Sequence, residues 1–164
     1  MHNKIRSENN ATFRYTSPML AKYDHLAHGF FTRLDGVSSS VYQSLNCSLQ
    51  SADNLGNVIQ NQTIVCNALG FTLNNLRLLD QAHSASVVTI NNASQTTSDL
   101  EADALVTSTP NLLLAIKTAD CVPILFYDPK NDIIAAAHAG WKGAVLGILD
   151  HTVFAMQDLG RYKK

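Results

Sequence analysis

The hydrophobic and polar positions of the chain change their pattern twice, which predicts helix, then strands, then helix. Between Asn54 and Leu69 apolar residues recur at helical spacing, and Gly70 follows as a C-terminal cap. A second helical pattern runs from Ala144 to Leu159 and ends at Gly160. We therefore expect two helices, one on each side of a different kind of segment.

Short runs of β-branched and aliphatic residues fill the segment between the two helical patterns. Clusters of Asn, Asp, Ser, Pro and Gly separate these runs, as expected of strands joined by turns. The predicted strands are Leu76–Leu79, Ser86–Ile90, Ala104–Thr107, Leu112–Ile116, Val122–Tyr127 and Ile133–Ala137. Asp128–Asp132, between the last two, has the composition of a hairpin turn. Because the strands are grouped and do not alternate with helices, we predict an α+β fold with layered mixed β-sheets flanked by helices, in a single domain.

The start of the chain is polar and predicts less regular structure. We expect residues 1–20 to form a loosely ordered lead-in and residues 21–164 to form the domain. Near its start, His28–Arg33 is a short apolar run that ends in polar residues, and Asp35-Gly36 predicts a turn. The polar N-terminus shows no signal peptide, and no apolar stretch approaches the length of a membrane span.

Composition and charge argue against two classes of binding partner, nucleic acids and membranes. The chain has 164 residues, a formal net charge of -1 and 15% charged residues. That balance provides neither a basic surface for nucleic acid nor a polybasic stretch for a membrane. The three cysteines, Cys47, Cys66 and Cys121, are odd in number and irregularly spaced, which favours reduced thiols in a reducing compartment. We expect a cytoplasmic protein with no nucleic-acid or membrane partner.

Reactive side chains gather in three separated islands, each where a predicted strand meets a turn. The islands are Gln81–Ser84, Thr118–Pro123 and His138–Gly143, and they contribute His83, Cys121 and His138. Taken singly, each of these residues also fits a structural role. Together they suit a catalytic metal with an open fourth position, or a Cys121 nucleophile with His138 as its base. Neither CxxC nor HxxxH spacing occurs, so a finger-type structural zinc site is not expected.

Six motifs in the chain, taken in order, resemble those of one known family. They are His28-Gly-Phe-Phe-Thr-Arg33, Ser44-Leu-Asn46, Gln81-Ala-His83, Ala102-Asp-Ala-Leu-Val-Thr107, Thr118-Ala-Asp-Cys-Val-Pro123 and His138-Ala-Gly-Trp-Lys-Gly143. This order resembles the YfiH-type laccase-domain family, also called multicopper polyphenol oxidases and now described mainly as purine nucleoside phosphorylases. The resemblance runs from the first motif to the end of the chain.

The resemblance implies a layered α+β fold and a zinc site with His83, Cys121 and His138 as its ligands. The implied activities are phosphorolysis of adenosine, inosine, guanosine and methylthioadenosine, together with adenosine deamination. A purine nucleoside and phosphate are therefore the expected partners. Arg33 is the candidate phosphate donor, because a guanidinium binds phosphate in a bidentate way, and His28 shares its motif. Asp120, beside the thiol, is a candidate to orient a ligand or to exchange a proton, and it equally fits a turn carboxylate.

Copper-dependent oxidation of phenols is the alternative activity associated with the family, with copper as the alternative cofactor. A laccase needs several coppers and therefore many histidines. The remaining histidines, His2, His25 and His151, are expected to be exposed to solvent, so the copper interpretation fits less well.

The chain departs from the family pattern in two places. Family members commonly carry Asn-Arg on the first helix, where this chain has Asn61-Gln62. They also usually continue for several tens of residues past Gly160. We expect the shorter chain to expose apolar surface, which favours self-association into a homo-oligomer. A further alternative is that the short form is an inactive interaction module.

Overall fold

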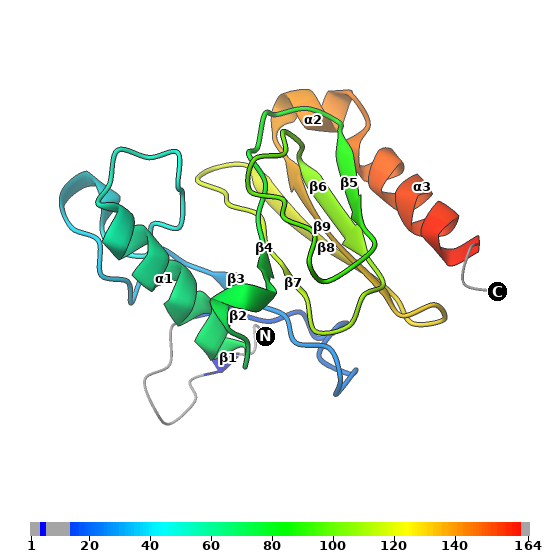
Figure 1. Ribbon diagram of the computed structural model, residues 1–164, viewed down its shortest axis with the longest axis horizontal. Helices are drawn as coiled ribbons and strands as arrows, with labels where there is room; N and C mark the ends of the chain where they lie inside the picture. Colours follow the sequence, from blue (N-terminus) through cyan, green and yellow to red (C-terminus); the bar gives the residue numbers. More distant parts are fainter. Residues whose placement is uncertain (1–3, 6–13, 162–164) are drawn as a thin grey trace. The chain divides into compact units, whose positions relative to one another are not determined.

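The computed structural model describes residues 4–5 and 14–161, which form a mixed α+β fold (Figure 1). Contacts divide the chain into two compact units between Asn74 and Asn75. The N-terminal unit contains β1 (Lys4–Ile5), β2 (Arg14–Tyr15), β3 (Phe30–Phe31), a 3-10 helix at Ser40–Tyr42 and α1 (Leu55–Ala68). Its strands form an antiparallel sheet in the order β1-β2-β3.

The expected lead-in contributes strand residues to this sheet. Arg14 pairs with Phe31, and Tyr15 pairs with Phe30. Residues 1–3 and 6–13 lie outside the described residues. The boundary that we place at residue 20 stays a prediction.

Helix α1 begins and ends as the sequence predicts. The Asn54 side chain caps the N-terminus by accepting the Asn57 N–H at 3.2 Å, which satisfies one of the unpaired N–H groups of the first turn. After Ala68 the chain leaves the helix, and Gly70 takes the left-handed conformation with a φ of 81°. Glycine adopts this conformation more readily than other residues, and helices commonly end with a residue in it.

The Asn61-Gln62 pair on α1 fixes the loop that precedes the helix. Asn61 is fully buried, and its amide nitrogen donates to Ser38 Oγ, Ser44 O and Asn46 O. Its oxygen accepts the Val37 N–H at 2.8 Å, so every polar atom of this buried side chain is paired. Gln62 donates to Cys47 O at 2.9 Å. The Asn61-Gln62 pair therefore holds residues 37–47 in place.

The C-terminal unit is built around a four-stranded mixed sheet in the order β5-β6-β9-β8. Its strands are β5 (Val87–Ile90), β6 (Ala104–Thr107), β8 (Val122–Asp128) and β9 (Ile133–Ala139). β5 and β6 are parallel, whereas β9 is antiparallel to both of its neighbours. A second sheet pairs β4 (Leu76–Arg77) with β7 (Leu113–Leu114) in parallel, next to a 3-10 helix at Leu73–Asn75. All six predicted strands are present, and the α+β prediction is confirmed.

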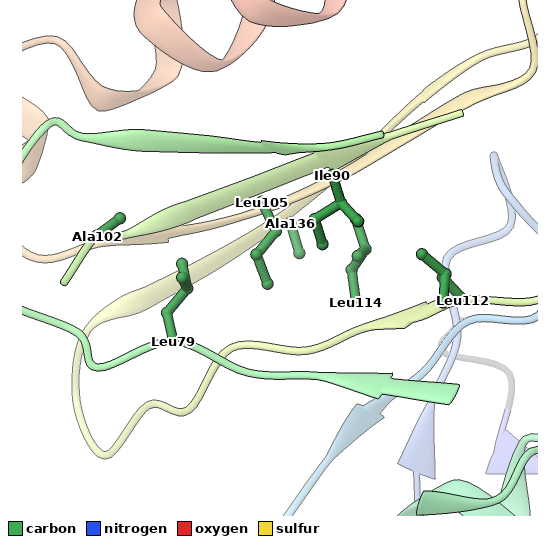
Figure 2. Close-up of a cluster of buried hydrophobic side chains, with 7 residues drawn as sticks. All are labelled: Leu79, Ile90, Ala102, Leu105, Leu112, Leu114 and Ala136. Atoms are coloured by element: carbon green, nitrogen blue, oxygen red, sulfur yellow. The ribbon is translucent and has the colours of Figure 1, made fainter. Parts of the chain in front are cut away.

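Each face of the four-stranded sheet is buried against a different layer. Because side chains alternate across a strand, Ile133, Ala135 and Ala137 of β9 share one face, and they pack with Ile148 and Met156 of the last helix. The other face packs Ile90, Leu105 and Ala136 against Leu79, Leu112 and Leu114 in the layer of β4 and β7, as Figure 2 shows. The unit thus has three layers, and its core lies on both sides of the sheet.

The last helical segment is split, which differs from the prediction of one helix over residues 144–159. α2 covers Trp141–Val145 and α3 covers Ile148–Arg161. Gly147 separates them with a φ of 85°, a conformation that breaks the helical hydrogen-bond ladder and that glycine adopts at little cost.

Trp141 and Val145 on α2 are 80% and 81% exposed. The expected self-association stays a prediction. No helix among the described residues is both long and apolar enough to span a bilayer.

Candidate metal centre

The strand directions bring the three islands to one end of the four-stranded sheet. β9 is antiparallel to β6 and β8, and β5 is parallel to β6. The starts of β5, β6 and β8 therefore lie at the same end as the C-terminus of β9. His83 lies in the turn before β5, Cys121 directly precedes β8, and His138 is near the end of β9. Their ligand atoms all lie within 4.8 Å of one another.

The three side chains leave one side of the cluster open. Cys121 Sγ lies 3.8 Å from His83 Nε2. The rings of His83 and His138 meet edge to face, with 4.9 Å between centroids. His138 is buried, Cys121 is half-buried and His83 is exposed. A small ion held by these atoms would keep a coordination position that faces solvent.

Asp103 is the carboxylate partner of this cluster. In the register of β6 with β9, Ala104 pairs with Ala137, so Asp103 stands opposite His138 and on the same face. His138 Nδ1 lies 2.7 Å from Asp103 Oδ1, and the His138 N–H donates to Asp103 O at 2.8 Å. A histidine bonded in this way through Nδ1 presents Nε2 to a metal.

The same carboxylate closes the turn that carries His83. Asp103 accepts the backbone N–H groups of Ala82, His83 and Ser84 at 3.2, 3.0 and 2.6 Å, and it accepts the Ser84 hydroxyl at 2.8 Å. These bonds hold His83 in the left-handed conformation, with a φ of 56°. Burial alone would raise the pKa of Asp103, but the bonds from His138, Ser84 and His83 together outweigh it and lower that pKa.

Gly140 provides the space that the ligand atoms occupy. Pro123 pairs with His138 in the register of β8 with β9, which places Cys121 opposite Gly140. A Cβ at Gly140 would lie 2.7 Å from His83 Cδ2 and 3.2 Å from Cys121 Sγ. The backbone there has a φ of -69° and a ψ of 162°, which any residue adopts. Space for the ligand side chains is therefore what this position requires, and the cluster fits a metal.

The Cys121 thiol is not activated by its protein neighbours. Partial burial raises its pKa, and the negative charges of Asp120 and Asp103 raise it further. The thiol donates toward Asp120 Oδ1 at 3.7 Å, and Asp120 itself is exposed. A thiolate at this position therefore needs a cation that the described side chains do not supply.

Arg33 and His28, the other two predicted site residues, belong to the N-terminal unit. Arg33 is exposed, and its Nε donates to Gln43 O at 2.8 Å. His28 Nε2 accepts the Ser17 N–H at 2.9 Å, and burial lowers the pKa of its ring. Of the remaining histidines, His25 and His151 are exposed as predicted, and His2 lies outside the described residues.

Sequence reasoning did not assign a role to Asp103, although it lies in one of the family motifs. One signal was available: Asp103 directly precedes the predicted strand Ala104–Thr107, which is mostly apolar. A carboxylate in such a position is buried and must be paired. The identity of its partners follows from the strand register, which the sequence does not give.

Fold and cluster together define an α+β protein with an open, three-ligand site able to hold a metal. The sequence profile described as multi-copper polyphenol oxidoreductase laccase matches residues 27–164. The chain belongs to this family.

The chain is similar to proteins named purine nucleoside phosphorylase. The chain is 45% identical over 133 residues to the purine nucleoside phosphorylase of Deinococcus radiodurans, covering 81% of this chain and 51% of the relative. It is 36% identical over 145 residues to that of Bacteroides thetaiotaomicron, covering 84% and 54%. The chain thus spans about half the length of these relatives.

Solved structures share the fold. YlmD from Geobacillus stearothermophilus superposes with a TM-score of 0.79 at 29% identity, over 97% of this chain and 61% of that protein. YfiH from Bacillus licheniformis gives a TM-score of 0.68 at 38% identity, over 73% of this chain and 48% of that protein.

Proposed function

We propose that this chain belongs to a zinc-dependent purine nucleoside phosphorylase. The open cluster of His83, Cys121 and His138 carries this proposal. The names of the relatives from Deinococcus and Bacteroides support the reaction. The substrates are adenosine, inosine, guanosine or methylthioadenosine with phosphate, and adenosine deamination is a second activity of the same site.

Zinc suits the donor set better than copper does. A catalytic zinc commonly has three protein ligands, such as one thiolate and two imidazoles, and a fourth position open to water or substrate. When bound, zinc lowers the pKa of a coordinated water to roughly 7 and polarises a substrate oxygen. A laccase needs several coppers, and His25 and His151 are exposed and do not belong to the three-ligand cluster. A reduced thiol as ligand also agrees with a location in the cytoplasm, where thiols are kept reduced.

The chain's own residues have separable roles in this proposal. Asp120, 3.7 Å from the thiol, exchanges a proton at the open side of the site. Arg33 binds phosphate through the guanidinium edge that does not face Gln43 O. His28 supports the Arg33 motif through its bond to Ser17 N–H.

A cysteine hydrolase in which His138 activates Cys121 has less support. His138 Nδ1 is already bonded to Asp103, and the Cys121 pKa is raised rather than lowered. Cysteine nucleophiles need the opposite shift. Zinc that protects Cys121 from alkylation would agree with the metal site and contradict the hydrolase.

The direct test is turnover by the purified, zinc-loaded chain. Incubation with inosine and phosphate is expected to release hypoxanthine and ribose 1-phosphate, seen by chromatography, and omission of phosphate is expected to stop the release. Adenosine is expected to yield adenine and, through deamination, inosine. A chain that holds one zinc ion but releases no base would contradict the proposed function and leave the metal site standing.

Replacement of Arg33 by alanine is expected to raise the KM for phosphate by about 10- to 100-fold, since a hydrogen bond to a charged group contributes about 1.5–3 kcal/mol. The KM for inosine and the bound zinc are expected to stay unchanged. Arg161→Ala is the control, because Arg161 is an exposed arginine that pairs with Asp158 at 3.1 Å. Equal phosphate KM values for the two variants would exclude Arg33 as the phosphate ligand.

A further inference from the structure

We propose that Asp103 is the positioning residue that presets both histidines of the metal centre before the ion arrives. This inference rests on the metal site alone and not on the nucleoside reaction. Asp103 is fully buried and contacts the two ligand-bearing segments at once. It touches neither substrate nor metal in this role.

The contacts of Asp103 require a carboxylate and no other side chain of that size. Oδ1 accepts from His138 Nδ1 and the His83 N–H. Oδ2 accepts from the Ala82 N–H, the Ser84 N–H and the Ser84 hydroxyl. Every partner is a donor, so both oxygens must be acceptors. An asparagine amide would turn its NH₂ group toward donors in either orientation, leaving buried donors unpaired.

The first consequence concerns the tautomer of His138. Because Asp103 only accepts, the proton of the neutral imidazole stays on Nδ1, and the Nε2 lone pair is available to the ion. Within residues 4–5 and 14–161, no other group forms a hydrogen bond with this ring that would select one tautomer. Without Asp103, an ion would have to select both the tautomer and the ring orientation, which lowers its affinity.

The second consequence concerns His83, which lies on a strained turn. Its positive φ of 56° is uncommon for a residue with a side chain. Three consecutive N–H groups, from Ala82 to Ser84, converge on the one carboxylate and hold that turn. Asp103 therefore couples the two histidines, and loss of this one residue disturbs both ligands.

The test is zinc affinity of the Asp103→Asn variant, measured by competition with a chromophoric chelator. We expect a loss of about 10- to 100-fold, the usual effect of removing an outer partner of a metal ligand. With cobalt in place of zinc, the variant is expected to need more cobalt for half-saturation than the unsubstituted chain. Its visible ligand-field spectrum is also expected to differ in shape. Asp53→Asn is the matched control, since Asp53 also accepts side-chain and backbone donors but lies in the N-terminal unit.

Two results would overturn the inference. One is an Asp103→Asn protein that binds zinc as tightly as the unsubstituted chain. The other needs no variant: a long-range ¹H–¹⁵N spectrum of the zinc-bound chain in which His138 Nδ1 carries no proton. This second measurement decides the matter even if Asp103→Asn does not fold.

The proposed function fails separately from this inference. A chain that binds zinc, shows the Nδ1 proton and loses affinity on Asp103→Asn, yet releases no purine base, supports the inference and contradicts the phosphorylase. A chain that binds no zinc at all contradicts both.

Discussion

Substitution of Cys121 by serine is expected to lower zinc affinity by more than about 100-fold and to abolish phosphorolysis. Outer partners of metal ligands alone are worth 10- to 100-fold, and Cys121 supplies the only thiolate of the His83, Cys121 and His138 set. A hydroxyl at this position stays protonated at neutral pH and is a much weaker ligand for zinc. Chelator competition and the inosine assay measure the two effects.

Cys47→Ser is the control for this experiment, because it makes the same change at a half-buried cysteine in the N-terminal unit. Its zinc content and turnover are expected to match those of the unsubstituted chain. A Cys121→Ser protein that keeps one tightly bound zinc ion would contradict the assignment of Cys121 as a ligand. Lost turnover with unchanged zinc would instead favour the nucleophilic cysteine.

Substitution of Gly140 by alanine is expected to lower zinc affinity by at least about 10-fold, comparable with the loss of an outer partner, while the chain still folds. The added Cβ would lie 2.7 Å from His83 Cδ2, closer than carbon atoms approach without displacement. The imidazole or the Cys121 thiol must then move, and metal–ligand distances tolerate only about 0.2 Å. The backbone conformation at Gly140 suits alanine, so the effect is confined to the site.

Gly160→Ala serves as the control for added volume. Its Cβ would meet the Asn131 side-chain amide at 3.0 Å. This group lies at the β8–β9 turn, at the end of these two strands opposite the end that carries Cys121 and His138. Thermal unfolding monitored by circular dichroism is expected to show both variants folded, with zinc binding weakened in Gly140→Ala alone. Equal zinc affinity in the two variants would refute the role assigned to Gly140.

Much of the fold was predictable because local sequence decides local structure. Short runs of β-branched and aliphatic residues bounded by turn residues predicted the six strands of the C-terminal unit, and Ala104–Thr107 agrees to the residue. The helical spacing of apolar residues between Asn54 and Leu69, with Gly70 after it, predicted the bounds of α1. The last helix was predicted too far toward its N-terminus, because its apolar spacing continues through Gly147 while the backbone there turns left-handed.

The sequence by itself determined which residue types are present for chemistry: His83, Cys121 and His138 on strand ends, in motifs typical of one family. The tertiary structure decided which of them meet. The strand order β5-β6-β9-β8 brings these three residues to one end of a sheet, and the β6–β9 register places Asp103 against His138. Pairing between strands depends on contacts among residues far apart in the chain, and no local pattern encodes it. For that reason the three candidate ligands could be named from the sequence, whereas Asp103, which is bonded to His138, and Gly140, which leaves space beside His83 and Cys121, could not.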